Sequence, residues 1–291
     1  MLQLLGYYPM NTNRHDKSIS NRLLIILASI SLAISGCAIQ PHAPTQTAEE
    51  QRQQALVKPE VMQSFYVLKR LMERTPLARN VKYNTEPLWK YISWTNPSNP
   101  NAEHSFDLPS ILPDTIAVSF SPGSAATAPG WKLSHTSFIK NHYYFFLTST
   151  WSQAEAEEAA QALRILANDA RQCYHEESDK FLEKFKLKAQ DWQALEVRPI
   201  MPEEARKHRI LAENAFREKD LEKASDEYDA ALKIYPCWPS GLFNLAYIDA
   251  ANENYQLAVF DMQRYLTLVP NAKDAQHCRD DMLIWKGKMG E

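Results

Sequence analysis

A 34-residue self-similarity near the C-terminal end constrains this chain more than any other feature. The stretch 211–236 reads LAENAFREKDLEKASDEYDAALKIYP, and the stretch 245–270 reads LAYIDAANENYQLAVFDMQRYLTLVP. The pairs that recur at the fixed interval are Leu211/Leu245, Ala212/Ala246, Ala224/Ala258 and Pro236/Pro270. The alanines allow two antiparallel helices to approach closely, and each proline ends a second helix. A period of this length is typical of helical hairpins stacked in a row.

This pattern resembles the tetratricopeptide repeat (TPR). The resemblance implies a TPR domain over 203–291, with two repeats followed by a capping helix from about Asn271–Asp274 onwards. Tyr228 and Met262 are expected to fill the space between the paired helices. The sequence departs from the family pattern at His208, Leu242, Ala215, Asp249 and Tyr265.

The resemblance also implies a concave groove lined by the first helix of each repeat. Its positions are Arg206, Arg209, Glu213, Phe216 and Arg217, then Ser240, Phe243, Tyr247, Ala250 and Ala251, then Asp274, His277, Asp281, Ile284 and Trp285. Cations beside exposed aromatic rings suit an extended peptide with acidic and apolar side chains. We expect the contact surface to comprise Arg206, Arg209, Arg217, Phe243, Asn244 and Tyr247. The alternative is that several groove positions, above all Phe216 and Trp285, belong to the core between repeats.

Some TPR domains grip a C-terminal carboxylate with cations and asparagines at fixed repeat positions. Arg209 and Asn244 match that arrangement, but Glu213, Asp274 and Cys278 stand where the remaining ligands belong. Two of these replacements are carboxylates that would repel an anion. The sequence therefore does not predict a carboxylate clamp.

The N-terminal segment has the pattern of an export signal. Three basic residues precede the apolar run 23–35, which is too short to span a membrane comfortably. The run ends in Ile34-Ser35-Gly36-Cys37, which resembles the bacterial lipoprotein box. The resemblance implies a signal peptide over 1–36, diacylation of Cys37 with palmitate-like chains, and, because Ala38 follows, sorting to the outer membrane. The alternative is an ordinary signal peptide or an anchor helix.

The polar, Gln-rich residues 37–59 are expected to form a flexible tether. The next segment, 60–150, is expected to be a small antiparallel β-containing domain. Its predicted strands are 114–121, 131–139 and 142–150, with Ile116, Val118 and Phe120 on one face and a turn at Lys140-Asn141. Strands followed by an amphipathic helix are similar to a pleckstrin-homology-like barrel. A plain α+β domain is the alternative.

Connecting helices are predicted over 151–202, a region that lacks Gly and contains Pro only near its end. Ser152 and Glu155 have the spacing of a capping box. A second helix is expected after about Ser178, with Trp192 packing on the first repeat. The overall prediction is an α+β chain that ends in an α-α repeat array.

Charge and residue content narrow the possible functions. The formal net charge of −3 argues against a nucleic-acid binder that works by electrostatics. Apart from Cys37, three cysteines remain at 173, 237 and 278; we expect them to be small buried side chains, and a disulfide between two of them stays open. The run 174–177 (YHEE) lacks a second histidine at zinc-ligand spacing and is expected to be a solvated face. His135 and His142 flank the predicted hairpin without an obvious third ligand.

We therefore predict no metal, no cofactor and no enzymatic activity. The predicted function is that of a lipid-anchored TPR lipoprotein in the bacterial cell envelope, facing the periplasm from the outer membrane. It would bind a protein or peptide partner as an adaptor or assembly factor, and contact the membrane through its lipid. The alternative is an envelope enzyme whose site lies in 80–150, with the repeats as a docking arm.

Overall fold

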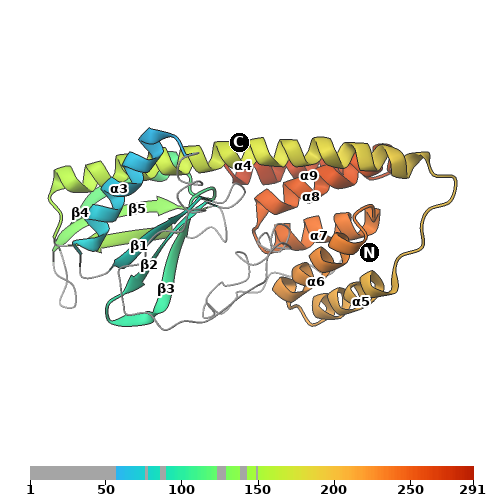
Figure 1. The fold of residues 1–291 in the computed structure, drawn as a ribbon, viewed down its shortest axis with the longest axis horizontal. Coiled ribbons are helices and arrows are strands. Elements are labelled where there is room, and N and C mark those ends of the chain that lie inside the picture. Colours follow the sequence, from blue (N-terminus) through green and yellow to red (C-terminus); the bar gives the residue numbers. More distant parts are fainter. Residues whose placement is uncertain (1–56, 76–77, 86–89, 123–128, 138–142, 149) are drawn as a thin grey trace, which may run out of the picture. The chain divides into compact units, whose positions relative to one another are not determined.

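The computed structural model of the chain describes residues 57–75, 78–85, 90–122, 129–137, 143–148 and 150–291. In chain order the elements are α3 (Pro59–Glu73), β1 (Arg79–Asn84), β2 (Tyr91–Asn96), β3 (Asn99–Asp107), the 3₁₀ turn η1 (Pro113–Thr115), β4 (Ala117–Ser121), β5 (Gly130–Thr136), β6 (Tyr143–Thr148), α4 (Gln153–Ala194), α5 (Glu203–Arg217), α6 (Leu221–Ile234), α7 (Pro239–Ala251), α8 (Tyr255–Leu268) and α9 (Ala275–Lys288). Antiparallel strands are thus followed by a run of helices (Figure 1). The predicted α+β class is confirmed.

The strands form two three-stranded antiparallel sheets, β1-β2-β3 and β4-β5-β6. The second sheet is the predicted one, with β5 paired to β4 through Val118 and Leu133 and to β6 through Leu133 and Phe146. Its predicted turn at Lys140-Asn141 lies outside the described residues. The first sheet was not predicted, because β3 reads NPNAEHSFD and shows no regular alternation of apolar residues. Pairing with β2 holds this strand in place.

The prediction that Ile116, Val118 and Phe120 share one buried face is wrong in part. Ile116 is buried, Val118 is half-buried, but Phe120 is 55% exposed. β4 is paired on one side to β5, and Phe120 instead packs edge-on against Trp131, with 5.4 Å between the ring centroids. The residues just before Ile116 form η1, so the strand begins later than expected.

The first core joins α3, the strands and the first half of α4. α3 begins with a proline in its first turn and buries Leu68 and Leu71 completely. The indole nitrogen of Trp151 donates a hydrogen bond to the Leu71 carbonyl at 2.9 Å. Leu163 and Leu166 on α4 close the core from the other side.

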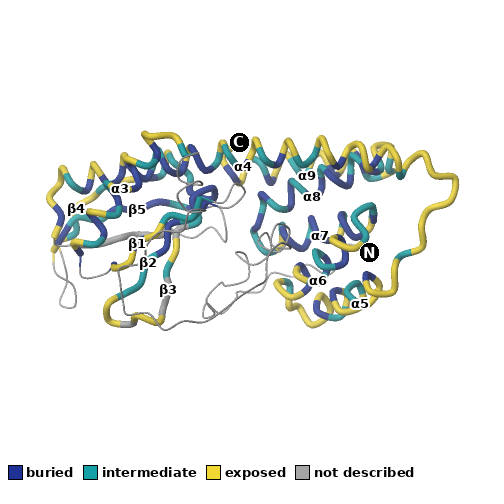
Figure 2. The backbone as a smooth tube through the Cα atoms, viewed as in Figure 1, coloured by how far each residue is buried: buried dark blue, intermediate teal, exposed yellow. Residues whose placement is uncertain are grey.

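α4 is a single helix of 42 residues, so the predicted break after about Ser178 is wrong. The predicted capping box is confirmed: the Glu155 amide donates to Ser152 Oγ, and the Ser152 amide donates to Glu155 Oε2. The helix continues because each half has its own core to pack on. Its buried residues up to Ala170 belong to the first core, and Phe185 and Ala189 belong to a second one (Figure 2).

The second core lies within helical hairpins whose geometry repeats every 34 residues. The α5–α6 and α7–α8 turns each contain a left-handed residue, Lys219 with φ 63° and Glu253 with φ 61°. The amide after each of these donates back to the carbonyl of Ala215 or Asp249. The recurring alanines, Ala212, Ala224, Ala246 and Ala258, are fully buried, as are Tyr228 and Met262. These residues make the close helix contacts that the sequence predicts.

α9 stands where the sequence places the capping helix. It begins at Ala275, directly after Asp274, whose side chain makes no capping hydrogen bond. Leu283 and Ile284 are 69% and 60% exposed, whereas Met282 and Trp285 contact the second core. The helix therefore presents a narrower apolar face than its sequence indicates.

The second half of α4 packs against α8 rather than on the first repeat. Phe181 contacts Phe260, with ring centroids 5.2 Å apart. Gln193, next to Trp192, donates hydrogen bonds to the carbonyls of Thr267 and Leu268. Trp192 itself carries the Arg198 guanidinium over its ring at 4.1 Å. α4 thereby covers the α8 side of the hairpin row (Figure 1).

Candidate functional site

The residues predicted to contact a partner lie on two helices of the hairpin row. Arg206, Arg209 and Arg217 are on α5, and Phe243, Asn244 and Tyr247 are on α7. Asn244 Nδ2 donates a hydrogen bond to the Tyr228 hydroxyl of α6 at 3.0 Å. Burial raises the pKa of Tyr228. Asn244 therefore joins α7 to α6 on this side of the hairpin row.

The α7 residues belong to an aromatic cluster. The Phe243 ring lies 4.8 Å from that of Tyr247 and 5.3 Å from that of Tyr265, measured between centroids. Tyr247 in turn packs edge-on against Trp285 of α9 at 5.6 Å. Phe243 and Tyr247 are half-buried, so part of each ring is accessible to solvent. The neighbouring rings hold these two side chains in a single geometry.

Carboxylates of the α9 end fix the tyrosines of this cluster. The Tyr247 hydroxyl donates to Asp281 Oδ2, and the Tyr265 hydroxyl donates to Asp274 Oδ1 at 2.8 Å. Burial, and then these carboxylates, raise the pKa of both phenols well above the ordinary value of 10. The two hydroxyls are thus protonated and engaged, which leaves the ring of Tyr247 as its accessible part. The carboxylates of Asp274 and Asp281 also place negative charge at this end of the row.

Each arginine of α5 has a polar partner on its own helix. Arg206 lies 3.1 Å from Glu203, Arg209 lies 3.7 Å from Glu213, and Arg217 donates to the neutral Asn214 amide oxygen at 3.1 Å. Exposed ion pairs of this kind contribute about 0–1 kcal/mol. A carboxylate of a partner can therefore replace these contacts at little cost.

The remaining groove positions divide between surface and core. Exposed or half-exposed positions are Glu213, Ser240, Ala250, Ala251, Asp274, His277 and Asp281. The alternative prediction placed Phe216 and Trp285 in the core between repeats. Trp285 is 7% exposed and does belong to the core, whereas Phe216 is 49% exposed and does not. Phe216 and Ile284 hold equivalent repeat positions and are both exposed. Large apolar side chains thus stand at both ends of the row.

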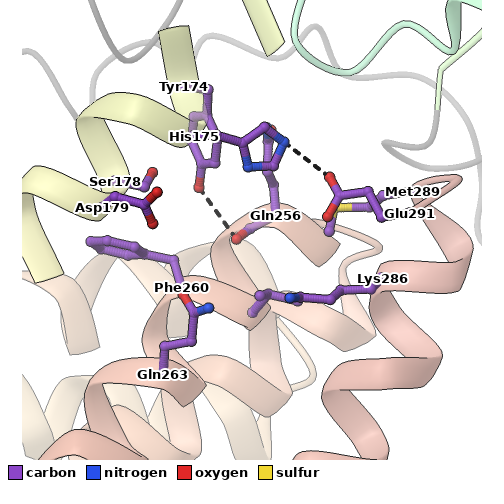
Figure 3. A pocket seen from close by; sticks show the side chains of 11 residues that line it. Tyr174, His175, Ser178, Asp179, Gln256, Phe260, Gln263, Lys286, Met289 and Glu291 are labelled. Carbon is purple, nitrogen blue, oxygen red and sulfur yellow. Dashed lines mark hydrogen bonds and ion pairs between the residues drawn. The ribbon is translucent and has the colours of Figure 1, made fainter. Parts of the chain in front are cut away.

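A small cavity lies where α4, α8 and α9 meet (Figure 3), with a volume of about 120 Å³. The Tyr174 hydroxyl donates to the Gln256 carbonyl at 3.3 Å, and His175 Nε2 lies 3.2 Å from Glu291 Oε1. Tyr174 is 5% exposed, so the expectation of a solvated face over 174–177 is wrong at that residue. Sequence reasoning missed this cavity because its α4 residues are about 80 or more positions away from those of α8 and α9.

The histidines do not converge on a reactive centre within the described residues. His135 is 2% exposed in β5, and burial lowers its pKa to about 4. His142 lies outside the described residues. Across the described part of the chain, no group of three or more His, Cys, Asp or Glu is arranged to hold a metal ion.

The three described cysteines are all free. Cys278 is fully buried, as predicted. Cys173 and Cys237 are half-buried, so the expectation of a buried small side chain is wrong for both of these residues. Lys90 Nζ donates to Cys173 Sγ at 3.1 Å, and Cys237 donates to the Lys188 carbonyl at 3.9 Å.

Comparison with known proteins found no family model, no curated protein and no solved structure that matches this chain. Within the residues that the structure describes, no helix combines the length and the apolar character needed to cross a membrane.

Proposed function

We propose that residues 203–291 form a TPR domain whose inner face binds a protein or peptide. The proposal is supported by the equal geometry of the two interhelix turns, Lys219 and Glu253, and by the fully buried alanines at the close helix contacts. The observation that carries it is the aromatic cluster centred on Phe243 and Tyr247. Its rings are locked by packing and hydrogen bonds, so a partner would meet a surface that needs little ordering on binding.

The expected ligand is an extended segment with apolar and acidic side chains. Phe216 and Ile284 offer exposed apolar contacts, and the α5 arginines offer cations whose present partners are weakly held. The position of His135 inside the β5 core favours a packing role for that residue over the alternative of an enzyme site there. We therefore propose an adaptor or assembly factor rather than an enzyme.

We further propose that the chain is a lipoprotein of the bacterial cell envelope, anchored by Cys37 and facing the periplasm from the outer membrane. The support is the sequence pattern before Cys37, which lies outside the described residues. In cells, Cys37→Ser should move the protein from the membrane fraction to the soluble fraction, because two or more acyl chains are needed for stable attachment. Membrane fractionation with immunoblotting measures this. Unchanged fractionation would contradict the lipid anchor.

The groove is tested by site-specific photocrosslinking in the envelope of the producing cell. A photo-crosslinking amino acid in place of Phe216 should give discrete protein adducts, whereas the same residue in place of Leu187, on the outer face of α4, should not. Combining the probe with Arg217→Glu should reduce the adducts about tenfold. Reversing a charge at the rim of the groove should weaken the binding of an acidic partner by about 1–2 kcal/mol. Lys207→Glu, an exposed α5 residue outside the groove positions, is the matched control. Equal adducts from positions 216 and 187 would defeat the groove assignment.

A further inference from the structure

The outer face of α5 carries apolar side chains that remain open to solvent. This face comprises residues spaced three or four positions apart, which share one side of the helix: Lys207, Ile210, Leu211, Asn214 and Glu218. Ile210 and Leu211 are 42% and 46% exposed. Within the described part of the chain, α5 lies at the end of the hairpin row and packs against α6 (Figure 1).

The second hairpin shows what this side of a first helix contacts in the row. At the 34-residue interval, Ile210 and Leu211 correspond to Asn244 and Leu245 of α7. Asn244 donates to the Tyr228 hydroxyl of α6 at 3.0 Å, and Leu245 is 2% exposed. On α7 these positions therefore face the preceding hairpin. Among the described residues, α5 has no hairpin before it, so its corresponding apolar pair stays exposed.

Side chains of opposite charge flank the apolar pair along the helix. Lys207 precedes it by about one turn, and Glu218 follows it by about two turns. Asn214 Nδ2 donates to Glu218 Oε1 at 2.8 Å, which draws the carboxylate back toward the apolar pair. The carboxylate of Glu203, at the start of the helix, is paired with Arg206 at 3.1 Å. The outer face thus has a cation at one end and an anion at the other.

This pattern is complementary to itself when two copies of α5 cross in antiparallel orientation. With a two-fold axis near Leu211, the apolar pairs of both copies meet at the centre. Lys207 then lies about 6 Å from the axis, between the levels of Asn214 and Glu218 of the other copy, at about 4.5 and 10.5 Å. A parallel crossing would instead place like charges opposite each other.

We propose that the outer face of α5 is a dimerisation face that binds the same face of a second copy of this chain in antiparallel orientation. One helix from each copy makes a small interface, so the dimer is weak and depends on concentration. Phe216, a groove position, lies on a different side of α5 and is not covered by the second copy. The dimer therefore does not depend on the proposed peptide groove.

Co-purification of two differently tagged copies tests the dimer. Both full-length copies are produced in one cell and purified in mild detergent through the first tag, and immunoblotting measures the second tag. Leu211→Ser in both copies should reduce recovery of the second tag about tenfold, because the apolar centre is lost. Leu283→Ser changes a residue of α9 that is 69% exposed and should leave recovery unchanged. Absence of the second tag with the wild-type chain, or equal recovery from all three chains, would overturn the proposal.

A charge exchange tests the antiparallel orientation with exposed residues that do not support the core. Lys207→Glu places a carboxylate beside Glu218 of the other copy and should reduce recovery about tenfold. Lys207→Glu combined with Glu218→Lys should restore recovery to within about threefold of the wild-type value. The two positions are about 16 Å apart along one helix, so they compensate only across two copies. Unchanged recovery with Lys207→Glu, or no restoration in the double variant, would contradict the pairing.

Discussion

At the scale of single residues, His135 should make the stability of the fold depend on pH. It is buried in β5, and burial lowers its pKa to about 4 from an unfolded value near 6.5. Between these values the unfolded chain binds more protons than the folded chain, so stability falls as the pH is lowered. This residue alone should remove about 2 kcal/mol of the unfolding free energy between pH 7 and pH 5.

Urea unfolding at the two pH values measures this effect. His135→Phe should lose less stability than the wild-type chain over the same interval, by about 2 kcal/mol. His277→Gln changes a histidine whose side chain is 61% exposed and is the matched control. It should follow the wild-type pH dependence. A His135→Phe chain with the full wild-type loss would show that His135 binds its proton as readily in the folded chain as in the unfolded chain.

Gly241, in the first turn of α7, leaves room for the ring of Trp238, the residue just before that helix. A Cβ atom on it would lie 2.1 Å from the Trp238 ring, which stacks on Tyr228 at 5.7 Å between centroids. Gly241→Ala should therefore destabilise the chain by about 1–3 kcal/mol through overpacking. Gly287 in α9 has no atom within 4 Å of its Cβ position, so Gly287→Ala should be neutral or stabilise by up to about 1 kcal/mol. Thermal unfolding compares the pair, and equal shifts would refute the contact.

At the scale of elements, the capping box at the start of α4 should contribute measurably to stability. Ser152→Ala removes the acceptor of the Glu155 amide and should cost about 1 kcal/mol. Gln153→Ala changes the neighbouring exposed residue, which bonds to the Glu157 side chain, and should cost less than half as much. Chemical denaturation with both variants checks the difference. If both variants lose the same unfolding free energy, the capping box has no special contribution to stability.

The same elements show what the sequence could and could not predict. The capping box and the 34-residue hairpins were predictable because their residues are neighbours in the chain or recur at a fixed interval. The continuity of α4 through Ser178 was not, since it depends on two cores supplied by distant segments. β3 was missed because pairing with β2, rather than its own alternation, makes it a strand.

The candidate groove also has features that the sequence predicts and features that only packing decides. Repeat positions predicted which residues lie on α5, α7 and α9. They could not predict that Tyr247 bonds to Asp281, or that Trp285 is core while Phe216 is exposed, because those outcomes depend on packing between repeats. The Lys90–Cys173 contact spans 83 residues, and nothing local in the sequence indicates it.

At the scale of the whole described molecule, α4 is the element that both cores share. Its residues up to Ala170 pack with α3 and the strands, and Phe185 and Ala189 pack with the helical hairpins. The Arg171 guanidinium adds a cross-link, donating to the carbonyls of Pro109 and Met289. A helix that spans both cores transmits unfolding from one to the other. The wild-type chain should therefore unfold in a single calorimetric transition.

Breaking α4 between its two cores tests this coupling. Glu176→Pro removes a helical hydrogen bond and introduces a clash with the preceding turn, at a cost of about 3 kcal/mol or more. Because Glu176 is exposed, the substitution leaves the buried contacts of either core in place. The expected result is two separate transitions by differential scanning calorimetry, whereas Glu176→Ala should keep one. If Glu176→Pro lowers the melting temperature but preserves a single transition, contacts such as those of Arg171, rather than the helix itself, couple the cores.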